Sequence, residues 1–166
     1  MILSYGNTPS LTGYRNKTLD LSSCTKDKKK TSCNVQVDLK DYDGEQIEYW
    51  FVLKDIANTV VESKHVWLGV DITAPKINNP TSLFRIDGKY VYFKLNITEK
   101  NLDSITYIDN ADRIPRAKKL CSANSVKNGM CEKKVSFKEG NHNVDIQAID
   151  KAGNMVAQNI VFDMVY

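Results

Sequence analysis

The chain has 166 residues, 42% of them hydrophobic and 26% charged, which is typical of a soluble globular protein with one medium domain or two small ones. The formal net charge is +3, with 23 basic residues dispersed among 20 acidic ones, so the basic face of a nucleic-acid-binding protein is not expected. No apolar stretch reaches the length of a membrane span, and the first residues lack the features of a signal peptide. If the protein is exported, we therefore expect a mature form or a fragment of a longer precursor.

The first half of the chain alternates short apolar segments with polar turns. Cys24 and Cys33 flank a polar loop that carries a run of lysines. Turns are expected at residues 41–45 and 54–58, since both segments contain the Asp, Asn or Gly residues that favour turns. The predicted strands of this half cover residues 2–5, 35–39, 47–53 and 60–70.

The second half repeats this order. Cys121 and Cys131 flank another polar loop, and turns at residues 138–141 and 150–154 match the two turns of the first half. The predicted strands cover residues 89–97, 102–108, 133–137, 143–149 and 155–165, after a short opening segment at 76–77. Agreement in order and spacing indicates one module used twice. We expect two domains, residues 1–73 and 74–166, joined by a short and semi-rigid junction.

Alternation with a period of two residues predicts that each module is a β-sandwich. Val144, Ile146 and Ala148 fall on one side of their strand and polar residues on the other, as in a strand with one face on a core. The matching strand at 47–53 is apolar on both sides, so we expect its outer face, which includes Trp50, to be covered. No segment has a sustained helical period, and almost no helix is expected.

Two short sequence motifs resemble those of tandem bacterial and archaeal immunoglobulin-like repeats of surface proteins. Val-Asp-Ile-Thr-Ala-Pro at residues 70–75 is similar to the junctions of such repeats, and Asp-x-Ala-Gly-Asn at 150–154 is similar to the turn before their last strand. The counterpart at 55–58 lacks the glycine. The resemblance implies two tandem immunoglobulin-like sandwiches in an adhesin, surface layer, pilus or enzyme-appended stalk. It implies neither a catalytic activity nor a ligand.

Four cysteines allow three pairings, and the repeat indicates the disulfides Cys24–Cys33 and Cys121–Cys131. Disulfides imply an extracellular or cell-surface location. A zinc site is disfavoured because there is no Cys-x-x-Cys and the two histidines, His65 and His142, are isolated in the sequence.

Calcium is the other metal that the sequence suggests. Asp55, Asp71 and Asp150 could bind it near the junction, but we expect Asp55 and Asp150 to cap turns instead, because a calcium site needs six or more oxygen ligands. We therefore expect no metal and no cofactor.

Several residues are candidates for contact with a partner. The basic run of Lys26, Lys28, Lys29 and Lys30 is displayed in the first disulfide loop, where it either contacts an acidic glycan, a lipid headgroup or another subunit, or is simply solvated. Trp50 and Trp67 are candidates on the first module. Asn16 and Asn96 begin Asn-x-Thr triplets and are candidate glycosylation sites.

The first module is expected to lack its opening strands. The stretch from Met1 to Cys24 is about half as long as the stretch from Pro75 to Cys121. Either the chain is a fragment cut inside a domain, or another chain fills the gap by strand addition.

The sequence contains no nucleophile elbow, phosphate-binding loop or nucleotide fingerprint, so we do not expect an enzyme. The function predicted is that of an extracellular structural or adhesive module of a microbial surface protein or filament, in a homo-oligomer or polymer. The alternative is a non-catalytic appendage of a secreted enzyme that binds its substrate or a glycan.

Overall fold

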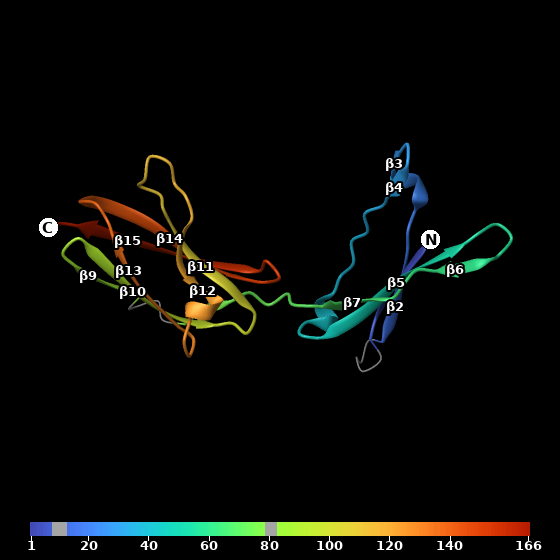
Figure 1. Ribbon diagram of the computed structural model, residues 1–166, viewed down its shortest axis with the longest axis horizontal. Helices are drawn as coiled ribbons and strands as arrows, with labels where there is room; N and C mark the ends of the chain where they lie inside the picture. Colours follow the sequence, from blue (N-terminus) through green and yellow to red (C-terminus); the bar gives the residue numbers. More distant parts are fainter. Residues whose placement is uncertain (8–12, 79–82) are drawn as a thin grey trace. The chain divides into compact units, whose positions relative to one another are not determined.

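The computed structural model describes residues 1–7, 13–78 and 83–166. It confirms the all-β class, with antiparallel sheets and only short 3-10 turns in the described residues. The chain divides into two compact units, Met1–Ile72 and Thr73–Tyr166 (Figure 1), within one residue of the boundary expected from the repeat. Within these residues, no helix is long and apolar enough to cross a membrane.

Unit 1 contains one main sheet. Its antiparallel strands follow the order β2 (Tyr14–Thr18), β1 (Ile2–Gly6), β5 (Gln46–Lys54) and β6 (Val60–Glu62), and β7 (Val66–Gly69) also pairs with β5. The predicted strand at 60–70 is thus broken into two. The break follows from Ser63, whose hydroxyl accepts the Phe51 N–H at 2.9 Å in place of a backbone carbonyl.

The polar loop expected between Cys24 and Cys33 is a β-hairpin. Its strands are β3 (Thr25–Asp27) and β4 (Lys30–Ser32), which pair only with each other, and the Cys24–Cys33 disulfide closes its base. A single 3-10 turn, η1 (Leu21–Ser23), precedes it, with the Asp20 side chain accepting the Ser22 N–H.

A small core packs against one face of the unit 1 sheet. Its buried members are Leu3, Tyr5, Leu19, Tyr42, Ile47 and Val70. Tyr42 ends the turn η2 (Lys40–Tyr42) and is fully buried, and its hydroxyl donates to the Gly13 carbonyl at 2.7 Å. The segment at 34–39 lies over this core, but the structure does not make it a strand, which corrects the strand predicted at 35–39.

Unit 2 contains two sheets that face each other across a core. One sheet has the order β12 (Lys118–Ser122), β11 (Leu102–Asp109), β14 (Gly140–Asp150) and β15 (Met155–Met164). In the other, β10 (Tyr90–Thr98) pairs with β13 (Met130–Ser136), β9 (Phe84–Asp87) and β8 (Lys76–Ile77). The turn η4 (Ala123–Ser125) follows β12.

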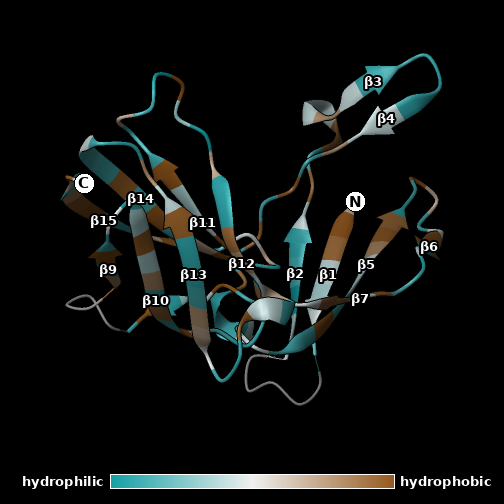
Figure 2. Ribbon diagram, turned by 60° about the vertical axis from the view of Figure 1, so that its left-hand side comes forward, coloured by the Kyte–Doolittle hydropathy of each residue, from teal (hydrophilic) through white to brown (hydrophobic). Residues whose placement is uncertain are grey.

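The core of unit 2 is built by period-two alternation on both sheets. Val144, Ile146 and Ala148 are fully buried, as predicted, and Val91, Phe93 and Leu95 face them from β10. The alternation is visible as brown and pale bands along β10 and β14 (Figure 2). The Cys121–Cys131 disulfide joins β12 of one sheet to β13 of the other inside this core.

The turns before the last strands are capped by aspartates. In unit 1, Asp55 Oδ1 accepts the N–H groups of Ala57 and Thr59, both at 2.8 Å. In unit 2, Asp150 Oδ1 accepts the Asn154 N–H and Oδ2 accepts the Asn154 side-chain amide. Both aspartates therefore cap their turns, as the sequence predicted.

Candidate interaction surfaces

The basic run is displayed on the β3–β4 hairpin. Lys26, Lys28, Lys29 and Lys30 are all exposed, and among the described residues their side chains make no recorded hydrogen bond or ion pair. Their recorded contacts are those of the backbone: Lys26 and Lys30 each pair with a residue of the opposite strand of the hairpin, and the Lys28 N–H donates to Asp27 Oδ1 at 2.6 Å. The arrangement is therefore compatible with both alternatives drawn from the sequence, contact with an acidic partner and a solvated hairpin.

Polar and aromatic side chains occupy the outer face of the unit 1 sheet. Cross-strand pairing places Tyr14, Glu48 and Trp67 in one row across the strands and puts Trp50 in the next. Gly6 lies in the first row, where a Cβ would collide with the carbonyl oxygen of Gly13. The rings of Tyr14 and Trp50 make an edge-to-face contact, with their centroids 5.3 Å apart.

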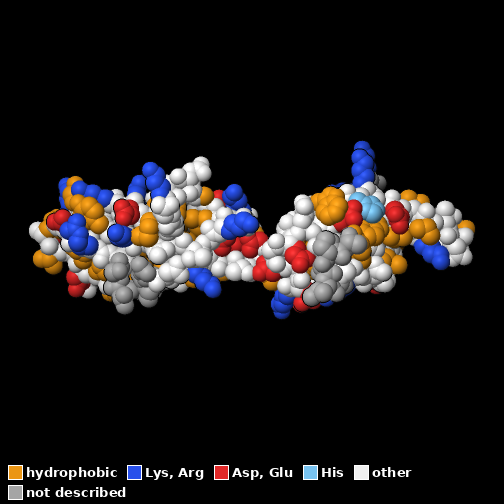
Figure 3. Space-filling view, turned by 90° about the horizontal axis from the view of Figure 1, so that it is seen from below, with side chains coloured by type: hydrophobic (Ala, Val, Ile, Leu, Met, Phe, Trp, Pro, Cys, Tyr) orange, Lys and Arg blue, Asp and Glu red, His pale blue; other side chains and the backbone are white. Residues whose placement is uncertain are grey.

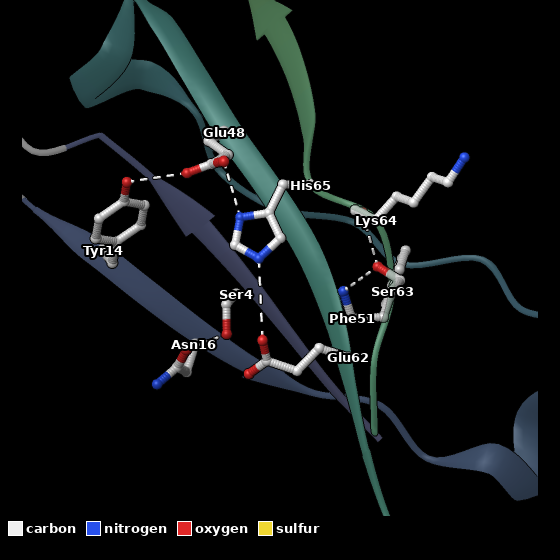
Figure 4. Close-up of polar contacts among 9 residues, drawn as sticks. All are labelled: Ser4, Tyr14, Asn16, Glu48, Phe51, Glu62, Ser63, Lys64 and His65. Carbon is white, nitrogen blue, oxygen red and sulfur yellow. Dashed lines mark hydrogen bonds and ion pairs between the residues drawn. The ribbon is translucent and has the colours of Figure 1, made fainter. Parts of the chain in front are cut away.

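His65 covers Trp50 on this face. Its ring stacks on the indole with centroids 4.4 Å apart, and its Nδ1 lies 2.8 Å from Glu48 Oε1. The other oxygen of Glu48 accepts a hydrogen bond from the Tyr14 hydroxyl at 3.2 Å. The Glu48 carboxylate therefore contacts both Tyr14 and His65 (Figure 4). His65 is isolated in the sequence but not in the structure. Its ring covers part of the outer face of β5, which was expected to be covered.

The two tryptophans named as candidate contacts therefore differ. Trp50 is half-buried beneath Tyr14 and His65, whereas Trp67 is 58% exposed. The space-filling view shows hydrophobic and acidic side chains beside the histidine of this unit (Figure 3). Of the two, Trp67 is the side chain on which a ligand could stack.

The two candidate glycosylation residues lie on strand faces that point away from a core. Asn16 is exposed on β2 and accepts the Ser4 hydroxyl at 2.8 Å. Asn96 is half-buried on β10, between the buried residues Leu95 and Ile97. Their glycosylation remains a prediction.

The segment at 34–39 is an edge without a partner. Val35, Val37 and Leu39 are half-buried against the core and the residues between them are exposed, which is the alternation of a strand. In the described residues, however, no backbone hydrogen bond joins 34–38 to another segment. A cavity of about 360 Å³, lined by residues 17–20, 23 and 33–36, separates the start of the segment from the end of β2.

The core-facing side of the same sheet is partly uncovered. Leu68 pairs with the buried Ile47 and Val66 pairs with Tyr49, so both point to the core side. They are nevertheless 45% and 42% exposed. Leu53 and Val61, which form a cross-strand pair farther along β5, are also exposed. Unit 1 therefore has both a partly uncovered apolar surface and an unpaired segment. The sequence predicted only that opening strands are missing from this unit.

A search of protein-family models and a search of curated proteins find no match to this chain.

Proposed function

We propose that the protein is an extracellular structural module of a surface protein or filament, built from two immunoglobulin-like units, of which the first is completed by a neighbouring subunit. Both units use the same order in their main sheet, β2-β1-β5-β6 and β12-β11-β14-β15. The two disulfides support an oxidising compartment.

One observation carries the proposal. Cys131 is the second residue of the extended segment β13, which pairs with β10 over seven residues. Cys33 begins the equivalent segment of unit 1, which has the same alternation and no partner strand among the described residues. Backbone groups left unpaired at a sheet edge readily pair with another chain. A neighbour that adds a strand here would join two subunits through main-chain hydrogen bonds.

Hydrogen exchange on the monomeric 166-residue chain tests this observation. We expect the amides of residues 34–38 to exchange at least about a hundredfold faster than those of β13 that bond to β10. Protection of 34–38 in the monomer would contradict the proposal, since it would show that the edge is already paired within the chain.

A second function is favoured by Trp67 and its neighbours. An exposed indole beside the carboxylate of Glu48 is the kind of surface that stacks on a sugar ring, so a glycan-binding appendage of a secreted enzyme is the alternative. Binding to a glycan array that Trp67→Ala abolishes, while Ile56→Ala leaves it intact, would favour this function. Ile56 is the matched control because it is fully exposed in a turn of the same unit.

A further inference from the structure

We propose that the element completing unit 1 is an extended strand of another polypeptide, which runs antiparallel to residues 34–38 and turns three alternate apolar side chains inward, opposite Cys33, Val35 and Val37. The inference rests on the proposed function, because it specifies the contact that the neighbour makes. It follows from unit 2, where the equivalent strand, β13, pairs with β10.

The register comes from β10 and β13. In unit 2 these strands are antiparallel, and Leu95, Phe93 and Val91 lie opposite Cys131, Lys133 and Val135. All three β10 side chains are at most 1% exposed. Aligning Cys33 with Cys131 places Val35 at the position of Lys133 and Val37 at that of Val135. The first unit therefore presents an apolar residue where the second has a lysine, which favours an apolar side chain in the incoming strand.

The exposed apolar residues lie where this strand would cover them. Val66 and Leu68 occupy the sheet positions of Ile160 and Phe162, because each pair is bonded to equivalent residues of β5 and β14. Ile160 and Phe162 are only 9% and 7% exposed. The sheet containing β10 provides that cover, and the Phe84 ring of β9 lies 5.2 Å from the Phe162 ring. The same surface of unit 1 thus fits the inner face of a strand or hairpin of the β9–β10 type.

The outward-facing positions allow the register to be tested without disturbing the groove. Gln36 is exposed and is equivalent to Lys134, which pairs with Tyr92 in unit 2. A strand in the proposed register therefore brings the residue equivalent to Tyr92 beside Gln36. Directly opposite residues in a sheet are close enough for a disulfide, whereas those two positions away are not.

The experiment uses the 166-residue chain with Gln36→Cys and a synthetic peptide with the sequence of residues 83–98. In a thiol–disulfide buffer, a Tyr92→Cys peptide should form the mixed disulfide, and a Tyr90→Cys peptide should form at least about tenfold less. The unmodified peptide should slow exchange of the 34–38 amides by at least about tenfold. A matched peptide with Ser at positions 91, 93 and 95 should give no protection.

The outcomes separate this inference from the function on which it rests. Equal trapping of both peptides, or protection by the serine peptide, would overturn the register and the chemistry of the strand while leaving the edge open to another partner. A homodimer linked through Gln36→Cys in the absence of peptide would place residue 36 of one copy beside residue 36 of another. That result would overturn the inference, whose register puts the residue equivalent to Tyr92 at this position. Slow exchange at 34–38 in the free chain would overturn the proposed function itself.

Discussion

The two units have the same order in their main sheet, but they differ in what lies over it. In unit 2 a second sheet buries the inward residues of β11, β14 and β15, and a disulfide ties the two layers together. In unit 1 the cover is an unpaired segment at 34–39, with Tyr42 filling the space beneath it. A sheet with one apolar face needs a second layer to bury that face. Unit 1 therefore has one sheet like the main sheet of unit 2, but the layer that faces this sheet is incomplete.

The comparison also separates the contacts that unit 1 makes within itself from those that it lacks. Hairpin β3–β4, the aspartate-capped turn and the sheet of unit 1 are contacts that this sequence makes by itself. The layer opposite the sheet depends on pairing that β13 has and the segment at 34–38 does not. The stability of unit 2 should therefore respond strongly to changes on its inner face, and the stability of unit 1 weakly to equivalent changes.

The largest expected difference concerns the equivalent residues Phe162 and Leu68. Phe162→Ala should lower the free energy of unfolding of unit 2 by about 3–5 kcal/mol, because it leaves a cavity between the sheets. Leu68→Ala should cost unit 1 about 1 kcal/mol or less, since nearly half of that side chain is already in water. Urea denaturation followed by circular dichroism measures both. Equal losses would show that the inner face of unit 1 is covered after all.

The two histidines provide the next comparison. In unit 2, the buried His142 lies between the Phe137 and Phe162 rings, and its Nδ1 is 2.6 Å from Asp109 Oδ2. His142→Leu would leave the Asp109 carboxylate buried without this partner, at a cost of about 3 kcal/mol. His65→Leu, which removes an exposed pair with Glu48, should cost less than about 1 kcal/mol. Thermal unfolding of both variants is the measurement, and a larger loss for His65→Leu would reverse the expected ranking.

The disulfides should differ in reactivity more than in free energy. They close loops of nearly the same length, so reducing either one should cost roughly 2.5 kcal/mol in the chain-entropy model. Cys121 and Cys131 are buried, however, whereas Cys24 and Cys33 are half-exposed. Limiting reductant should therefore open Cys24–Cys33 first, as read by alkylation and peptide mapping. Preferential opening of the other pair would show that unit 2 opens more readily than its packing indicates.

The smallest effect is expected at the turns. Burial by itself raises the pKa of Asp150, but the bonds from the Asn154 side chain and from nearby backbone N–H groups outweigh it and lower this pKa below 3.8. A lowered folded-state pKa contributes stability that is present above the unfolded-state pKa and is lost as the pH falls through the folded-state value.

Asp150→Asn should accordingly cost about 1 kcal/mol near neutral pH and progressively less as the pH is lowered toward about 2. Unfolding curves of the wild-type and variant chains across this range check the sign. A constant difference at every pH would contradict the role given to the carboxylate.

Period-two alternation predicted which residues face the cores, because side-chain direction is a local property. It succeeded for Val144, Ile146 and Ala148, and it also identified the inward side of the segment at 35–39. It was wrong to make that segment a strand, since pairing depends on a partner far away in the chain. The break at Ser63 was missed for a related reason: a side-chain hydroxyl replaces a backbone acceptor there.

The contacts of the two histidines could not be predicted from their own surroundings. His142 meets Asp109 only because β11 and β14 are neighbours, and His65 meets Trp50 and Glu48 only because the chain returns beside β5. Both sets of contacts depend on strand pairing over distances that no short motif encodes. By contrast, the aspartate caps at residues 55 and 150 were anticipated, because each bonds to backbone within the next four residues.

The location of the tryptophans has a spectroscopic consequence. The chain contains two, Trp50 and Trp67, and both lie on the outer face of unit 1. Emission excited at the red edge of the indole band therefore comes from unit 1 alone, while the ellipticity of the peptide bonds reports both units together. One indole is stacked on an imidazole and the other is open to solvent, so their emission maxima and quencher accessibility should differ. The intact protein thus carries its own optical label for the unit that another chain is proposed to complete.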